Sequence, residues 1–158
     1  YLAPKKLGAD RLINAYTAMR LFGTPAIAID FGTAITVDIV SANKEYLGGM
    51  ILPGLNLCLK SLHNNTQLLP EIKLRKPNNL IGRNTEQCIL TGLSYGFGSL
   101  IDGLINKIKT VLSPKTKVIV TGGDSLFIKP YCKQIDYFKP SLLLKGLAQI
   151  YRDNKKNT

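Results

Sequence analysis

Apolar residues in this chain occur in two patterns, as short unbroken runs and as longer stretches with helical spacing. The clearest runs lie within residues 26–41, where Ala-Ile-Ala-Ile and Ile-Thr-Val-Asp-Ile-Val are separated by Asp-Phe-Gly-Thr-Ala. Two apolar runs around a short turn that contains glycine predict a β-hairpin. A third strand is expected at 46–52, and two short strands are expected at 117–121 and 135–139.

Helical spacing of apolar residues predicts five helices, at residues 11–22, 55–63, 85–111, 125–133 and 142–153. Asp10 is expected to cap the first helix, because aspartate is a favoured N-cap, and Asn84 with Gln87 matches a capping box. The residues expected to face inward are Leu12, Tyr16 and Met19 in the first helix and Leu143, Leu147 and Ile150 in the last.

The order of these elements indicates the fold class. Antiparallel strands come first and strands alternate with helices afterwards, which predicts an α/β fold with a mixed sheet flanked by helices. Residues 64–82 are rich in Asn, Pro and Lys and are expected to form an extended surface segment. The Asn- and Lys-rich residues 154–158 are expected to be disordered.

The longest predicted helix carries a stripe of small residues, Gly92, Gly96, Ser99 and Gly103. Glycine lowers helix stability by roughly 1 kcal/mol relative to alanine, so the stripe requires a reason. One explanation is close packing against the same helix of a second subunit. The other is close packing against a sheet of the same subunit, and both explanations stay open.

Composition narrows the class of protein. The chain has 158 residues, of which 45% are hydrophobic and 20% charged, as in a soluble globular protein of one domain or slightly more. No apolar run approaches the roughly 20 residues of a membrane span. The three cysteines lack the spacing of a metal site and are expected to be buried, reduced thiols. The single histidine, His63, receives no role.

The net charge of +11 allows several partners. Nucleic acid would suit it, and so would an anionic small substrate. The lysines are scattered along the chain, however, whereas a nucleic-acid footprint is concentrated on one face. A solvated basic surface is therefore the favoured interpretation.

The tip of the predicted hairpin carries the strongest candidate chemistry. Asp30 ends the first strand, Gly32 is expected to allow a turn conformation that a side chain would resist, and Thr33 offers a hydroxyl and an N–H. This arrangement suits a phosphate held by N–H groups and a cation held by the carboxylate. The alternative is an ordinary hairpin whose polar residues only form the turn. Gly122 and Gly123 end another predicted strand and leave room for a ligand.

Five short motifs occur in order along nearly the whole chain, over about residues 1–152. They are Gly8-Ala9-Asp10-Arg11, Asp30-Phe31-Gly32-Thr33-Ala34, Gly48-Gly49-Met50-Ile51-Leu52-Pro53-Gly54, Gly82-Arg83-Asn84-Thr85 and Thr121-Gly122-Gly123. Each motif is weak alone, but in this combination the chain resembles type III pantothenate kinase. That family belongs to the superfamily of actin-like proteins, sugar kinases and Hsp70 ATPases.

The resemblance implies an RNase H-like, actin-like ATPase fold and a division of the chain. Residues 1–22 would end a first RNase H-like domain, residues 23–154 would form the second, and residues 155–158 would be a disordered tail. The family begins with a further Asp-x-Gly-Asn-Thr phosphate loop, and nothing like it precedes Tyr1. A front segment is therefore expected to be missing, and the chain as given is expected to be inactive alone.

The resemblance also assigns roles to particular residues. Asp10 would be the general base that takes the proton from the hydroxyl of pantothenate, and Asp30 would bind a monovalent cation, K⁺ or NH₄⁺. ATP, with Mg²⁺, would be contacted by Gly32, Thr33, Gly122 and Gly123. Pantothenate would be contacted by Tyr1, Gly8, Ala9, Asp10, Arg11 and Thr85, with Thr85 delivered across the interface of a homodimer.

The implied function is ATP-dependent phosphorylation of pantothenate to 4′-phosphopantothenate, the first step of coenzyme A synthesis, in the cytoplasm and without a nucleic-acid or membrane partner. One alternative is a non-catalytic regulatory or accessory relative that keeps the fold. Another is a kinase of the same superfamily that acts on a different small alcohol, because fold alone does not decide the substrate. A nucleic-acid-binding module, which rests only on the charge, predicts binding that weakens steeply with salt.

Overall fold

The computed structural model describes residues 1–156 and contains a mixed five-stranded sheet in the order β3-β2-β1-β4-β5. Strands β1 and β2 pair antiparallel, as do β2 and β3, whereas β4 runs parallel to both β1 and β5. The predicted α/β class with a mixed sheet is therefore confirmed. The strands are β1 (Ala26–Phe31), β2 (Ala34–Val40), β3 (Tyr46–Pro53), β4 (Lys117–Thr121) and β5 (Tyr137–Phe138).

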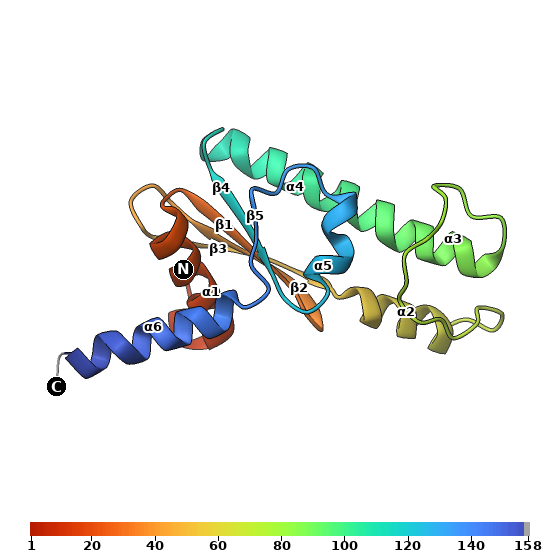
Figure 1. Cartoon of the computed structure of the whole chain (residues 1–158), viewed down its shortest axis with the longest axis horizontal. Coiled ribbons are helices and arrows are strands. Elements are labelled where there is room, and N and C mark those ends of the chain that lie inside the picture. Colours follow the sequence, from red (N-terminus) through yellow and green to blue (C-terminus); the bar gives the residue numbers. More distant parts are fainter. Residues whose placement is uncertain (157–158) are drawn as a thin grey trace.

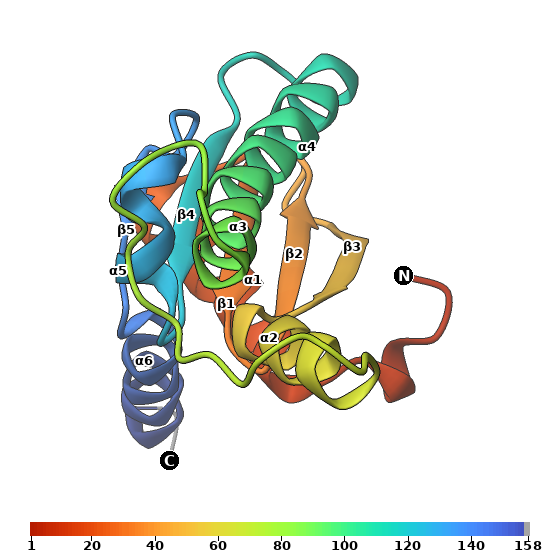
Figure 2. The same cartoon turned by 90° about the vertical axis from the view of Figure 1, so that its right-hand side faces the viewer.

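Helices cover both faces of this sheet (Figures 1 and 2). One face carries α1 (Ala9–Phe22) and α6 (Leu142–Lys156), and the other carries α4 (Phe97–Val111). The remaining helices are α2 (Leu55–Asn64), α3 (Thr85–Thr91) and α5 (Ser125–Ile128), with 3₁₀ turns at Pro4–Lys6 and Lys129–Tyr131.

Strand β1 shows how the sequence assigns residues to the two faces. Ile27, Ile29 and Phe31 belong to the large core under α4, whereas Ala26 and Ala28 belong to the smaller core under α1 and α6. Successive side chains of a strand alternate between faces, so Asp30 points to the same face as the two alanines. The small residues there let α1 approach the sheet closely, beside the carboxylate.

Helix α1 begins earlier than predicted, and a different side of it faces the core. Its N-cap is Gly8, and the Gly8 carbonyl accepts a hydrogen bond from the Leu12 N–H at 3.2 Å. Asp10 therefore lies inside the first turn, so the prediction that Asp10 is the cap is wrong. Leu12 is 50% exposed, because it lies on the side of the helix away from the buried residues. The buried residues are Asn14, Ala15, Thr17 and Ala18.

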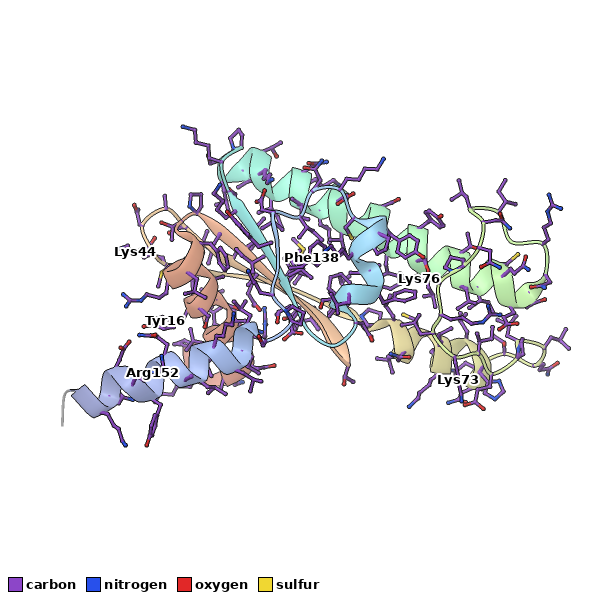
Figure 3. The ribbon with its side chains drawn as sticks, viewed as in Figure 1. Tyr16, Lys44, Lys73, Lys76, Phe138 and Arg152 are labelled. Carbon is purple, nitrogen blue, oxygen red and sulfur yellow. The ribbon has the colours of Figure 1, made fainter. Side chains whose placement is uncertain are left out.

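Helix α6 also turns a different face inward. Leu142 is fully buried and Gly146 packs against Thr17 of α1, whereas Leu147, expected inside, is 46% exposed. The α1–α6 groove, with a volume of about 240 Å³, lies between Tyr16 and Arg152 (Figure 3). The helix continues to Lys156, so the predicted disorder of residues 154–156 is wrong, and residues 157–158 lie outside the described part.

Helices α3 and α4 are joined by a π-helical turn at Gly92–Gly96 into one helix, Thr85–Val111, as predicted. A side chain added at Gly92, Gly96 or Gly103 would meet no atom within 4 Å. The stripe of small residues therefore faces outward, and close packing against a sheet of the same chain is excluded for the described residues. Asn84 accepts a hydrogen bond from the Gln87 N–H at 2.8 Å, which confirms the predicted cap.

By length and apolar composition, Thr85–Val111 could cross a membrane, although its apolar residues do not form one unbroken run. Its inward residues Ile101, Ile105 and Ile108 instead pack into the main core.

The prediction of buried cysteines is wrong. Cys58, Cys88 and Cys132 are free thiols, but Cys58 and Cys132 are only partly buried and Cys88 is exposed.

Candidate active site

The first turn of α1 presents Asp10 to solvent. The Oδ1 atom of Asp10 lies 2.6 Å from the position that a Cβ atom on Gly8 would occupy. A side chain at position 8 would therefore displace this carboxylate. Glycine at the N-cap leaves the carboxylate room to fold back over the start of the helix, where the helix dipole favours negative charge.

Asp30 lies half-buried beside Asp10, at the end of β1. Its Oδ2 atom accepts a hydrogen bond from Asn14 Nδ2 of α1 at 2.8 Å. Its Oδ1 atom lies against Gly122, where a Cβ atom would overlap it. Burial raises the pKa of Asp30, the bond from Asn14 lowers it, and the charges of Asp10 and Asp38 raise it further. The site therefore holds a carboxylate that lacks a cationic partner among the described residues.

Asp30→Asn is expected to raise the thermal midpoint of unfolding at neutral pH. The pKa of Asp30 is raised in the folded protein, so the folded state holds this proton more tightly than the unfolded state does. The stability of the protein therefore falls as the pH rises from the ordinary pKa of 3.8 through the folded-state pKa. Asparagine removes the cost of the buried charge and still accepts the bond from Asn14. The gain should be full above the folded-state pKa and vanish below 3.8.

Melting curves across the acidic to neutral range, in buffer without potassium, measure this difference. Asp102→Asn is the control and should lower the melting temperature. The Asp102 carboxylate accepts hydrogen bonds from the Lys133 and Gln134 N–H groups at 2.8–3.0 Å, and the substitution weakens them. A loss of stability in Asp30→Asn at neutral pH would contradict the prediction.

Arg11 and Tyr1 form a wall next to Asp10. The Arg11 Nε atom donates to Asp38 Oδ1 at 2.8 Å, and Asp38 is 1% exposed. Tyr46 donates its hydroxyl to the same oxygen at 2.7 Å, and the Tyr1 ring packs edge-on against the Tyr46 ring with centroids 5.5 Å apart. The structure therefore brings Tyr1 close to Arg11, the residue that follows Asp10, and the resemblance assigns all three to one substrate.

A second group of predicted residues lines a cavity of about 320 Å³ between the β1–β2 turn and the turn after β4. Gly32 and Thr33 form one side of it, and Gly123 and Asp124 form the other. Gly122 adopts φ +95°, a conformation that favours glycine, but Gly32 does not lie in that region. The expected reason for Gly32 is therefore wrong, because the turn there is compatible with a side chain.

A larger cavity of about 630 Å³ adjoins the first and shares Asn56, Lys60 and Asp124 with it. Lys73, from the extended segment before α3, lies on its rim (Figure 3). Figure 3 also places Lys44 at the opposite end of the molecule from Lys73. The two cavities therefore adjoin each other, and the smaller one reaches the β1–β2 turn.

Thr85 does not join this site within its own chain. It begins α3, and Figure 1 places that end of the helix at the opposite side of the molecule from α1. Of the predicted site residues, Asp10 lies near Asp30, and Asp30 borders Gly122 and Gly32, whereas Thr85 is remote from them.

Metal ligands are sparse at this site. Among residues 1–156, no group of three or more His, Cys, Asp or Glu side chains could hold an ion. Asp30 supplies one carboxylate, and the Oδ1 atom of Asn14 is buried without a hydrogen-bond partner in the described structure. This donor set fits a hard cation that needs few protein ligands and takes its other oxygen ligands from a substrate or from water.

Sequence reasoning missed several residues of the site. Asp38 and Asn14 are buried and polar, and each bonds to a predicted residue. A carboxylate inside the apolar run of β2 was a signal for Asp38, and the position one turn after Asp10 was a signal for Asn14. Asn56, which donates to Asp124 at 3.1 Å, gave no signal, because the two residues are 68 positions apart.

Comparisons with known proteins agree on one family. A family profile described as type III pantothenate kinase matches residues 1–107. The type III pantothenate kinase of Halalkalibacterium halodurans is 40% identical over 154 residues, covering 98% of this chain and 61% of that protein. The type III pantothenate kinase of Moorella thermoacetica is 40% identical over 151 residues, covering 96% of this chain and 59% of that protein.

Solved structures give a consistent picture. A crystal structure from Campylobacter jejuni, described as a conserved member of the Baf family of transcriptional activators, matches with a TM-score of 0.68 and 25% identity. The match covers 96% of this chain and 67% of that chain. The chain thus spans 61% and 59% of the length of the two curated relatives.

Proposed function

This chain belongs to the type III pantothenate kinase family, and from that premise we propose that its protein phosphorylates pantothenate with ATP. The product would be 4′-phosphopantothenate, and the reaction would open coenzyme A synthesis. One observation carries the proposal. Asp10 lies near Asp30, Asp30 borders the turn whose Gly32 and Thr33 line the cavity, and Arg11 follows Asp10 with Tyr1 close to it. A site for an alcohol thus adjoins a site for phosphates.

In the proposed reaction, the pantothenate hydroxyl oxygen bonds to the γ-phosphorus of ATP while the bond from that phosphorus to the ADP oxygen breaks. Asp10 accepts the hydroxyl proton on its carboxylate. Its exposed position in the first turn of α1 lets an incoming alcohol come within hydrogen-bond reach. Phosphoryl transfer otherwise depends on positioning and charge neutralisation, so the protein needs to supply only one group that accepts a proton.

Asp30 and Asn14 would hold a monovalent cation, K⁺ or NH₄⁺. When bound, that cation would offset the charge of the ATP phosphates, and Mg²⁺ would be carried by the phosphates themselves. Two observations support this assignment: Asp30 lacks a cationic partner in the described part, and the buried Asn14 oxygen has no donor. Gly32 and Thr33 would contact the phosphates, and Gly122 and Gly123 would border the nucleoside.

A homodimer would complete the pantothenate site. The outward stripe of Gly92, Gly96 and Gly103 leaves the helix backbone open to a close neighbour, and Thr85 begins the same continuous helix. A partner's helix packed along this stripe explains why Thr85 is remote from Asp10 in its own chain. We place Gly8 and Ala9 in the same pantothenate site, because they border Asp10.

The division into a first domain ending at residue 22 and a second over residues 23–154 stays a proposal. In this proposal the phosphate site is completed by a further loop of the whole protein, and the chain by itself does not turn over. The proposed setting is the cytoplasm, with neither nucleic acid nor a membrane as a partner.

ATP-dependent phosphorylation of pantothenate by the full-length protein tests the function. We expect turnover in potassium buffer and much less in sodium buffer of equal ionic strength, because Asp30 would bind the larger ion. Product can be measured by mass spectrometry at the mass of the phosphorylated substrate. A folded protein that makes no product with either ion would overturn the proposal.

The likeness to a structure described as a Baf family transcriptional activator keeps one second candidate, a regulatory protein of the same fold. That candidate predicts DNA binding that weakens steeply with salt and no kinase turnover. Turnover with another small alcohol but not with pantothenate would instead indicate a related kinase of different specificity.

A further inference from the structure

Asp38 is a buried carboxylate in the middle of β2 that three side chains share. Arg11 Nε of α1 and Tyr46 Oη of β3 donate to its Oδ1 atom at 2.8 and 2.7 Å, and Thr36 Oγ1 donates to its Oδ2 atom at 3.2 Å. Arg11 Nη2 lies 2.7 Å from Oδ1 as an ion-pair contact. One carboxylate therefore joins a helix and two strands.

The cost of this arrangement argues for a purpose beyond stability. Burial raises the pKa of Asp38, and the bonds from Tyr46, Arg11 and Thr36 lower it without restoring its ordinary value. A buried ion pair is rarely more stabilising than an apolar pair of the same shape. The pair does fix the orientation of the Arg11 guanidinium, because this planar group can place both Nε and Nη2 on Asp38 Oδ1 in only one orientation.

Asp38 neutralises the charge of Arg11. The Arg11 side chain is 11% exposed and its partner 1% exposed, so the pair presents little net charge to a ligand. Arg11 would therefore recognise a substrate by the direction of its remaining N–H donors rather than by attraction at a distance. Those donors are useful only while the carboxylate holds the guanidinium still.

The same carboxylate is also linked to Tyr1, through Tyr46. Tyr46 is held by its hydroxyl on Asp38, and its ring packs edge-to-face with the Tyr1 ring at 71° between the planes. The Tyr1 ring in turn lies 3.5 Å from the position that a Cβ atom on Gly48 would occupy. Arg11 and Tyr1, which the resemblance assigns to the pantothenate site, are thus both linked to one buried group, Arg11 directly and Tyr1 through Tyr46.

We infer that Asp38 is the positioning residue of the pantothenate wall, acting through Arg11 directly and through Tyr46 on Tyr1. This inference rests on the proposed function, because it assumes that the wall binds pantothenate. Asp38 is too deeply buried to touch a substrate, and it lies apart from the ATP cavity. Its loss should therefore change the binding of one substrate and leave the other substrate and the chemical step unaffected.

The test measures steady-state kinetics of the full-length protein with Asp38→Asn. We expect the KM for pantothenate to rise about 10- to 100-fold, as for the loss of one to two oriented hydrogen bonds, with kcat and the KM for ATP within about threefold. Tyr46→Phe removes one donor and keeps the Arg11 pair, so its KM should rise less, by about three- to tenfold.

Asp102→Asn is the matched control, because this carboxylate bonds to backbone N–H groups on the other face of the sheet. A comparable fall in melting temperature without a change in KM separates general destabilisation from positioning. The Arg11 Nε–H signal in NMR provides a second readout, and its protection from exchange should be lost in Asp38→Asn.

The outcomes separate the two levels of the proposal. Turnover by the wild type with an unchanged pantothenate KM in both Asp38→Asn and Tyr46→Phe would overturn this inference alone. Equal rises in the KM for both substrates would also overturn it. Absence of pantothenate turnover by the wild type would overturn the proposed function and this inference with it. If Asp38→Asn does not fold, Tyr46→Phe alone decides.

Discussion

Asp10→Asn in the full-length protein is expected to lower kcat for pantothenate phosphorylation by about 10²–10⁴-fold, the usual contribution of a general base. The substitution keeps the size of the side chain and removes its ability to accept the hydroxyl proton. The KM values for pantothenate and ATP should change by less than about threefold, because Arg11 and the glycine turns are untouched. Initial rates with saturating ATP and potassium measure the effect.

Asp153→Asn on α6 is the control, since this carboxylate bonds only to Gln149 within its own helix among the described contacts. It should leave kcat unchanged. Asp10→Asn should also cost less than about 1 kcal/mol of stability, the value of a carboxylate in a first helical turn. A kcat within tenfold of the wild type would remove Asp10 as the base, whatever its effect on folding.

Gly122→Ala is expected to cost about 2–5 kcal/mol of unfolding free energy, from backbone strain and overpacking together. Gly122 adopts φ +95°, which L-residues rarely adopt, and an added Cβ atom would overlap both Phe31 O and Asp30 Oδ1. The substitution should therefore also displace the Asp30 carboxylate and reduce the stimulation by potassium. Urea denaturation and rates in potassium and sodium buffers measure the two effects.

Gly123→Ala is the matched control one residue further on. Gly123 has no left-handed backbone conformation, and an added Cβ atom there would meet nothing within 4 Å. Its stability should stay within about 0.5 kcal/mol of the wild type, as for most surface changes. Equal losses in the two variants would show that the turn tolerates neither methyl group, and the argument from Asp30 would then fail.

Local sequence predicted the strands well because each carries its own signal. The alternation in Ala26–Phe31 already separates a bulky face from a small one, and Asp30 follows from that alternation at the end of the strand. The N-cap at Asn84 was predictable for the same reason, since the cap and its partner are three residues apart. Contacts of this range are determined by the sequence within one or two turns.

Helix faces were predicted less well where small residues carry the packing. The hydrophobic pattern of α1 favoured Leu12 as an inward residue, yet the helix buries Asn14, Ala15 and Ala18. Close approach to the alanines of β1 and to Gly146 of α6 selects small side chains, and no single helix reveals that its neighbours will be small. The N-cap at Gly8, two residues before the predicted cap at Asp10, was also missed.

The sequence by itself determined the fold class, the family and the identity of most candidate residues, because strands, turns and motifs are encoded over short spans. Tertiary structure alone decided which of those residues meet. It placed Asp10 beside Asp30, held Arg11 on Asp38 through 27 positions of chain separation, and left Thr85 apart. Such contacts depend on how helices dock on the sheet, and docking is set by the summed packing of distant side chains rather than by any local pattern.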